Sequence, residues 1–191
     1  MYKKYTRKQE FVIITFILLL ALVSTYFIYN KFSDERKIDY NSENLEVVFN
    51  DKTGDKISLK KITPLNDSVG LSTKAHNFEL NNNLTEKVNV QIKLEDDETA
   101  IEKDGCEERL IPKDNIKVTL KKNNTEGEIY RLSELDDGII LEDELEPIAH
   151  NTYAIRIWVD KDTALPAGSS FHYHGKIKIV EEDSLISINR W

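Results

Sequence analysis

Residues 150–179 read HNTYAIRIWVDKDTALPAGSSFHYHGKIKI, and this stretch decides the fold. Apolar side chains alternate with polar ones on both sides of a central turn at Pro166, Ala167 and Gly168. Successive side chains of a β-strand point to opposite faces of a sheet, so the spacing predicts two strands, each with one buried face. The alternating apolar residues are Tyr153, Ile155, Ile157 and Val159 before the turn and Phe171, Tyr173, Ile177 and Ile179 after it.

The same period of two continues on the N-terminal side of this stretch. It is strong at residues 45–49, 88–94 and 116–120, and weaker at 56–62, 74–80, 128–132 and 138–142. Clusters of Asn, Asp and Gly separate these segments, as turns require. The segments 97–111 and 160–168 are expected to hold short helical turns. Eight or nine short strands at such spacing predict an all-β fold, an antiparallel β-sandwich of jelly-roll or Ig-like type over residues 45–182, with a C-terminal tail at 183–191.

The N-terminal part of the chain predicts a membrane anchor. Residues 11–30 read FVIITFILLLALVSTYFIYN and carry no charge. Twenty helical residues span about 30 Å, the thickness of the hydrocarbon core of a bilayer. Residues 1–10 form a basic tail that the positive-inside rule places in the cytoplasm, which puts the domain after the charged linker 31–44 outside the cell. The alternative is a cleaved signal peptide, which would release a secreted domain.

The charge is strongly asymmetric. The chain carries a net charge of −8, of which residues 1–30 contribute +3, so that the rest carries −11. A domain this acidic repels nucleic-acid backbones, so no nucleic acid is expected as a partner. It could attract cations or basic partners, or the charge could serve solubility alone.

Two stretches resemble the TasA/camelysin-like secreted β-sandwich proteins of Gram-positive bacteria. The first is ITPLNDSVGLSTKAHNFELNNNLTEKVNVQIKLED, residues 62–96, in which a Pro-containing segment leads to a strand, an Asn-rich turn and an alternating strand. The second is residues 150–179, with a Trp-x-Asp signature at Trp158 and Asp160 followed by a Phe…Gly-Lys-Ile strand. The resemblance implies a cell-surface β-sandwich, either a biofilm matrix protein that polymerises by lending a strand or a metallopeptidase. Matrix subunits of that family are cleaved and released, whereas this chain is expected to keep its anchor.

His172 and His174 are the sharpest candidates for chemistry. Two histidines two positions apart on a strand point to the same face, where their imidazoles could share a zinc ion. A zinc site needs a third ligand, for which Asp160 and Glu181 are candidates. The alternative is a solvent-facing polar stripe that continues through Lys176 and Lys178. His76 is expected to be half-buried and His150 to lie in a loop.

Cys106 is the single cysteine, which excludes a disulfide within the chain and a multi-cysteine zinc site. It is expected to be a surface cysteine, with pairing between chains or a reactive thiol as the alternatives. The sequence contains no His-Glu-x-x-His, no Gly-x-Ser-x-Gly and no phosphate-binding Gly-rich loop.

Runs of carboxylates could hold calcium weakly between loops, although solvated loop charge is the favoured explanation. The runs are residues 95–98, 136–137, 142–144 and 181–183.

These observations favour a membrane-anchored, extracytoplasmic structural or adhesive protein. A sheet edge, or the tail around residues 185–188, could pair with a partner or a second copy by β-strand addition. The alternatives are a metal-dependent hydrolase of the camelysin type, and an accessory binding domain of a membrane or envelope complex.

Overall fold

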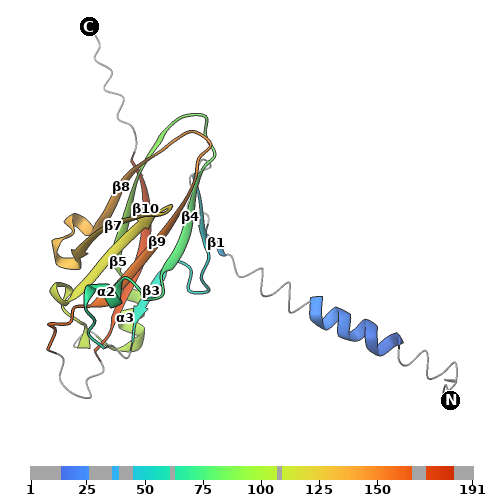
Figure 1. The fold of residues 1–191 in the computed structure, drawn as a ribbon, viewed down its shortest axis with the longest axis horizontal. Helices are drawn as coiled ribbons and strands as arrows, with labels where there is room; N and C mark the ends of the chain where they lie inside the picture. Colours follow the sequence, from blue (N-terminus) through green and yellow to red (C-terminus); the bar gives the residue numbers. More distant parts are fainter. Residues whose placement is uncertain are drawn as a thin grey trace, which may run out of the picture. The chain divides into compact units, whose positions relative to one another are not determined.

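The computed structural model describes residues 14–25, 36–38, 45–60, 63–106, 109–164 and 171–182. The chain divides into two compact units, residues 1–35 and residues 36–191. The first unit contains a helix over residues 14–25, and the second contains all the strands (Figure 1).

The helix at residues 14–25 lies inside the predicted membrane segment. Residues 11–13 and 26–30 of that segment lie outside the described residues. In the part of the chain that the structure describes, no helix has both the length and the hydropathy needed to cross a bilayer.

The second unit is all-β, in two antiparallel sheets, which confirms the all-β part of the prediction. The six-stranded sheet has the order β1 (Arg36–Ile38), β2 (Leu45–Phe49), β4 (His76–Asn82), β9 (His150–Val159), β6 (Ile116–Lys122) and β7 (Thr125–Arg131). The four-stranded sheet has the order β3 (Lys56–Leu59), β10 (Tyr173–Glu182), β5 (Val88–Asp96) and β8 (Ile139–Leu145). Two short helices, α2 (Asp67–Gly70) and α3 (Glu98–Asp104), lie toward the same end of the strands (Figure 1).

The chain passes from one sheet to the other at most of its connections; among the named strands, only β1–β2 and β6–β7 are consecutive pairs within one sheet. Strands β9 and β10, which come from the stretch that decides the fold, are interior strands of different sheets. Their alternating apolar side chains meet between the sheets in one hydrophobic cluster. That cluster includes Phe78 and Ile155 from the larger sheet and Ile92 and Ile177 from the smaller one. The burial of one face of each strand therefore joins the two sheets.

Several elements differ from the sequence prediction. Strand β1 lies within residues 31–44, which were predicted to be a linker, and pairs with β2. His150 was predicted to lie in a loop but opens β9, where its Nδ1 is 2.9 Å from Asn81 Oδ1. His76 is half-buried at the start of β4, as predicted. The helical turns expected at 97–111 correspond to α3, while residues 160–164 form a bridge and turns without a helix, and residues 165–168 lie outside the described residues.

Candidate functional site

The two candidate histidines lie at the start of β10, at an edge shared with three other segments. His174 pairs with Ser58 of the edge strand β3, and His172 forms an isolated bridge with Leu110. The backbone N–H of Ile111 donates to the carbonyl of His172 at 3.0 Å, and the N–H of His172 donates to the carbonyl of Arg109 at 3.1 Å. These bonds hold the segment after α3 against His172, the residue directly before β10.

Cys106 reaches the histidines because α3 ends directly before it. The helix is capped at its start by the Asp97 carboxylate, which accepts from the N–H of Ala100 at 3.2 Å. At its end Gly105 adopts the left-handed conformation with φ 57°, which a glycine adopts without steric cost. This turn reverses the chain, and the Cys106 N–H donates to the carbonyl of Ile101 at 3.3 Å. The cysteine was predicted to lie on the surface, and this is wrong, since its exposed fraction is 0%.

Cys106, His172 and His174 form one side-chain cluster. One potential ligand atom from each residue lies within 4.8 Å of the other two. The two imidazole rings meet edge to face, with centroids 5.0 Å apart and an interplanar angle of 77°. Within the described ranges, this is the group of three or more His, Cys, Asp or Glu residues close enough to hold a metal ion.

His174 is the more buried of the two candidate histidines, with an exposed fraction of 2%. The alternative of a solvent-facing stripe is therefore wrong for this residue, although Lys176 and Lys178 on the same face are exposed. Strand alternation places His174, Lys176 and Lys178 on one face of β10. Of these three side chains, only that of His174 is covered by α3 and the residues after it. Burial is the main cause that lowers the pKa of His174, and the neighbouring His172 adds to it. A lowered pKa keeps the imidazole neutral, which is the form that binds metals.

The two ring nitrogens of His174 have different surroundings. Its Nδ1 is hydrogen-bonded to the Ser58 hydroxyl at 3.1 Å. Its Nε2 is buried and has no hydrogen-bond partner among the described residues. The carboxylate of Asp104 lies close to Nε2, with its Oδ2 3.4 Å away. The same carboxylate oxygen accepts from Lys60 Nζ at 3.1 Å, and this bond lowers the pKa of Asp104.

The structure does not bring the predicted third ligands to the histidines. Asp160 lies in a separate buried network, where its Oδ2 is 2.5 Å from Arg131 Nη2 and 3.4 Å from Lys117 Nζ. Glu181 is seven positions after His174 on the same strand, a separation of roughly 23 Å at about 3.3 Å per residue. The residue that lies beside the two histidines is Cys106, and not Asp160 or Glu181. No local spacing pointed to it, because the cysteine and the histidines are far apart in sequence.

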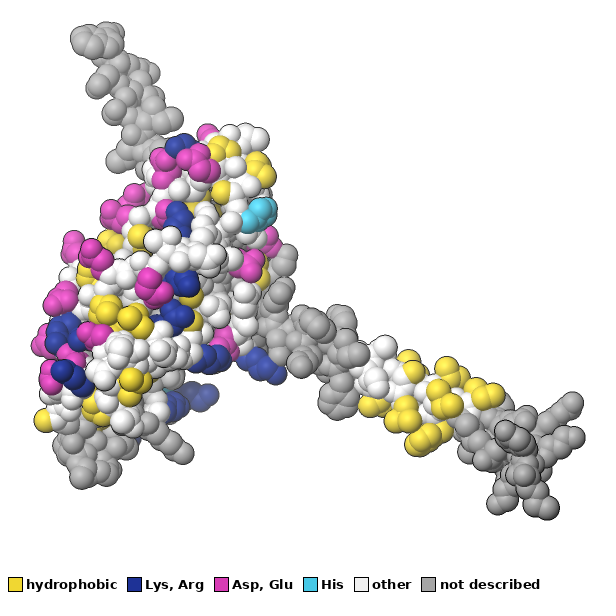
Figure 2. Space-filling model, in the orientation of Figure 1, with side chains coloured by type: hydrophobic (Ala, Val, Ile, Leu, Met, Phe, Trp, Pro, Cys, Tyr) yellow, Lys and Arg dark blue, Asp and Glu magenta, His cyan; other side chains and the backbone are white. Residues whose placement is uncertain are grey.

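Six carboxylates in three of the runs considered for calcium are paired with lysines. Their ion pairs are Glu95–Lys178, Asp96–Lys113, Asp97–Lys56, Asp137–Lys93, Asp143–Lys122 and Glu144–Lys87. Figure 2 shows the same interspersion of basic and acidic side chains on one face of the sandwich. These carboxylates contact ammonium groups, so they are not arranged as a cage of free oxygens of the kind calcium binds.

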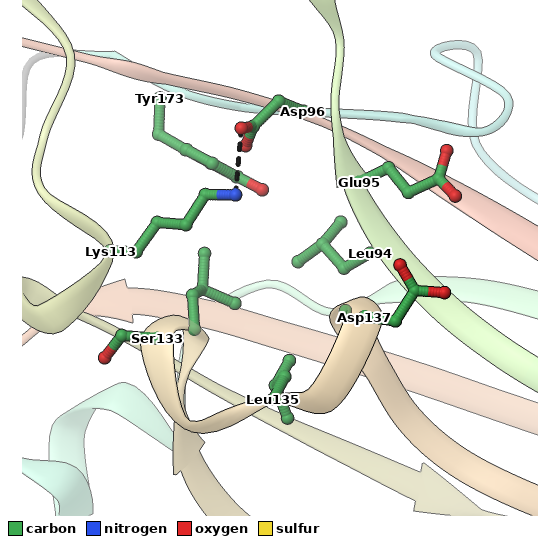
Figure 3. A pocket seen from close by; sticks show the side chains of 10 residues that line it. Leu94, Glu95, Asp96, Lys113, Ser133, Leu135, Asp137 and Tyr173 are labelled. Atoms are coloured by element: carbon green, nitrogen blue, oxygen red, sulfur yellow. Dashed lines mark ion pairs between the residues drawn. The ribbon is translucent and has the colours of Figure 1, made fainter.

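A second feature is a cavity of about 390 Å³ between the end of β5, the start of β10 and the segment 132–138 (Figure 3). The ion pair between Lys113 and Asp96, at 2.9 Å, crosses it beside the Tyr173 hydroxyl. Burial raises the pKa of Tyr173, and the charge of Asp96 adds to the effect. Tyr173 alternates with His172 and His174, so this cavity lies on the opposite face of β10 from the histidine cluster.

Comparisons with protein-family models, with curated proteins and with solved structures found no match to this chain. The resemblance to the TasA/camelysin-like proteins therefore stays a prediction.

Proposed function

We propose that this chain is a single-pass membrane protein whose β-sandwich has a structural or adhesive function on the outer side of the membrane. The observation that carries the proposal is the helix at residues 14–25. Phe16, Leu18 and Leu22 are 63%, 60% and 69% exposed, and Ile14, Ile17 and Leu19 are also more than half exposed. At 3.6 residues per turn these positions lie on every side of the helix. Figure 2 shows apolar side chains along its visible face.

A helix that is apolar all round needs an apolar environment on all sides, such as the core of a large protein or a bilayer. The uncharged sequence extends beyond this helix to residues 11–30, a length that matches the hydrocarbon core. Lys3, Lys4, Arg7 and Lys8 precede it and favour a cytoplasmic N-terminus. The β-sandwich then lies outside the cell, anchored on the membrane surface.

The adhesive part of the proposal rests on the sheet edges. Among the described strands, β7, β3 and β8 each have a single hydrogen-bonded neighbour, so one side of each carries backbone groups without a sheet partner in that part of the chain. Such an edge can accept a strand from another protein or a second copy. The frequent crossing between sheets favours a jelly-roll-like arrangement over an Ig-like one, as the resemblance to the TasA/camelysin-like matrix proteins also implies.

The anchor is tested by expressing the full chain in a bacterium and extracting the membranes at alkaline pH. We expect the chain to remain in the membrane pellet, and protease added to protoplasts to degrade the sandwich. The double variant Leu18→Arg/Leu19→Arg places two charges at the helix centre, at a cost of about 2.5–3.5 kcal/mol each, and should release the chain from the membrane fraction. Leu18→Ala/Leu19→Ala is the matched control and should stay in the pellet. Extraction of the unaltered chain by alkali alone would refute the anchor.

Adhesive function is tested separately, on the full chain in detergent, by light scattering across a range of concentrations. We expect assemblies that grow with concentration if a second copy supplies the added strand. A particle that holds one chain at every concentration would refute self-assembly.

A further inference from the structure

We propose that Cys106, His172 and His174 form a binding site for one zinc-class transition-metal ion, on the outer face of β10 next to α3. The site goes beyond the proposed structural function, since an anchored adhesive domain needs no metal.

The donor set indicates the class of ion. A thiolate and two imidazoles are nitrogen and sulfur ligands, which bind zinc and other borderline or soft ions, whereas calcium and magnesium prefer oxygen. Zinc bonds of about 2.0–2.3 Å in tetrahedral geometry place neighbouring ligand atoms about 3.3–3.8 Å apart. The three atoms here lie within 4.8 Å of one another, so closing the site requires each side chain to move by about 1 Å or less.

A second, independent observation is the state of His174. Its Nε2 is buried in the described part of the chain without a hydrogen-bond partner, and the residue is 98% buried, at 2% exposure. A buried polar atom without a partner costs about 1–3 kcal/mol, so it calls for an explanation. A metal ion at Nε2 would supply the missing interaction. The other ring nitrogen would then carry the proton and donate it to the Ser58 hydroxyl, the arrangement that orients metal-binding histidines.

The neighbouring Asp104 lies close to Nε2 of His174 but does not form a hydrogen bond with it. Its Oδ2 is 3.4 Å from Nε2 without forming a hydrogen bond, and it is already bound to Lys60. Asp104 also falls outside the group of atoms within 4.8 Å of one another. Three protein ligands therefore leave a fourth position open, and Asp104 borders the cluster on the His174 side, where it can accept a hydrogen bond from a water molecule in that position.

A metal ion here would connect parts of the fold that are distant in sequence. Cys106 follows α3, while His174 lies at the start of β10 and His172 directly precedes that strand. Binding to the folded state but not to the unfolded chain raises stability by mass action. The site should therefore be visible in unfolding as well as in metal content.

The test uses the full chain in detergent, purified with a reductant and stripped of metal, and titrated first with Co²⁺ and then with Zn²⁺. We expect one cobalt ion per chain, a thiolate-to-cobalt absorption band that zinc abolishes, and an unfolding temperature that rises with zinc. Cys106→Ser should remove the band. His172→Gln and His174→Gln should each weaken binding by about 100-fold or more, since even outer-shell partners contribute about 10–100-fold. His150→Gln, a histidine of the same domain that binds Asn81, is the matched control and should bind like the unaltered chain.

Absence of stoichiometric cobalt and zinc from the folded, reduced chain would overturn the proposal. So would a thiolate band that stays unchanged in both His172→Gln and His174→Gln, or tight copper(I) binding without zinc binding. X-ray absorption at the zinc edge of the unaltered chain does not depend on any variant folding. It should show one sulfur and two imidazole nitrogens, and a shell of oxygen atoms alone would contradict the site.

Discussion

At the scale of single residues, Asp160 shows how this domain tolerates a buried charge. It is 2% exposed and contacts two bases, Arg131 Nη2 at 2.5 Å and Lys117 Nζ at 3.4 Å. Burial raises the pKa of Asp160, but the hydrogen bonds from Arg131 and Lys117 outweigh burial and hold the pKa below its usual range. Neutralising Asp160 removes its ionic contacts with both bases, although Lys117 keeps Asp67 at 2.8 Å and the Arg131 side chain is 37% exposed.

Asp160→Asn should therefore lower the free energy of unfolding by about 1.5–3 kcal/mol, the range for a hydrogen bond to a charged group, measured by chemical denaturation. Glu144→Gln is the matched control: Glu144 also pairs with a lysine, Lys87 at 2.5 Å, but the two side chains are 52% and 51% exposed. The control should leave the denaturation midpoint unchanged. Equal loss in both variants would show that burial does not distinguish the two pairs.

The lowered pKa of Asp160 also predicts an acid dependence. A carboxyl whose pKa is lower in the folded state stabilises the fold above its unfolded value of 3.8, and this contribution is lost as the pH falls through the folded pKa. Denaturation curves recorded from pH 7 down to pH 2 should show that loss in the unaltered chain. The part due to this residue should be missing in Asp160→Asn, so that the stabilities of the two proteins converge at low pH. A constant difference across this range would contradict the assignment.

At the scale of elements, α2 explains why Trp158 is buried. Trp158 lies on the face of β9 that points away from the core between the sheets, and α2 covers it there. The helix is capped by Asn66, whose side chain accepts from the N–H of Val69 at 3.0 Å, and it ends at Gly70. A Cβ at Gly70 would lie 2.4 Å from two ring carbons of Trp158. Only a residue without a side chain allows the helix to cover the indole, which is 2% exposed.

Gly70→Ala should destabilise the domain by about 1–3 kcal/mol through overpacking, measured by the denaturation midpoint. Because the helix must move away, the fluorescence of Trp158 should also shift toward that of an exposed indole. Trp191 contributes to the same signal, so the comparison is made in a Trp191→Phe background. A midpoint that stays unchanged would mean that α2 does not pack against Trp158.

At the scale of the whole domain, polar side chains link the two sheets beside the apolar core. Tyr153 of β9 stacks on Phe78 with ring centroids 5.3 Å apart, and its hydroxyl donates to Asp143 Oδ2 of β8 at 2.5 Å. Lys122 of β6 donates to the other oxygen of the same carboxylate at 2.6 Å. Strands β9 and β6 belong to one sheet and β8 to the other, so Asp143 joins both.

Tyr153→Phe keeps the ring but removes the hydroxyl, and should lower the free energy of unfolding by about 1.5–3 kcal/mol, the range for a hydrogen bond to a charged group. If the sheets unfold as one cooperative unit, far-UV circular dichroism and tryptophan fluorescence should shift by the same amount. Separate transitions for the two probes would show that the sheets unfold independently.

The alternation of apolar residues was sufficient to predict the all-β class and most strand positions. Strand β2 has the predicted bounds, residues 45–49, and β5 and β6 extend the predicted segments by two residues each. Strand β1 was missed, because Arg36–Ile38 lies in a charged segment without alternation. Its pairing with β2 depends on backbone hydrogen bonds, which leave no trace in side-chain periodicity.

The sequence by itself determined which residues face the core, because burial of one face imposes a period of two on every strand. It also determined that His172 and His174 share a face of one strand. Only the tertiary structure decided that Cys106 is their neighbour and that His174 is covered while Lys176 is exposed. Those facts depend on where α3 ends and on the pairing of residues 109–111 with residue 172. Contacts between distant segments follow from packing, and local sequence patterns do not record them.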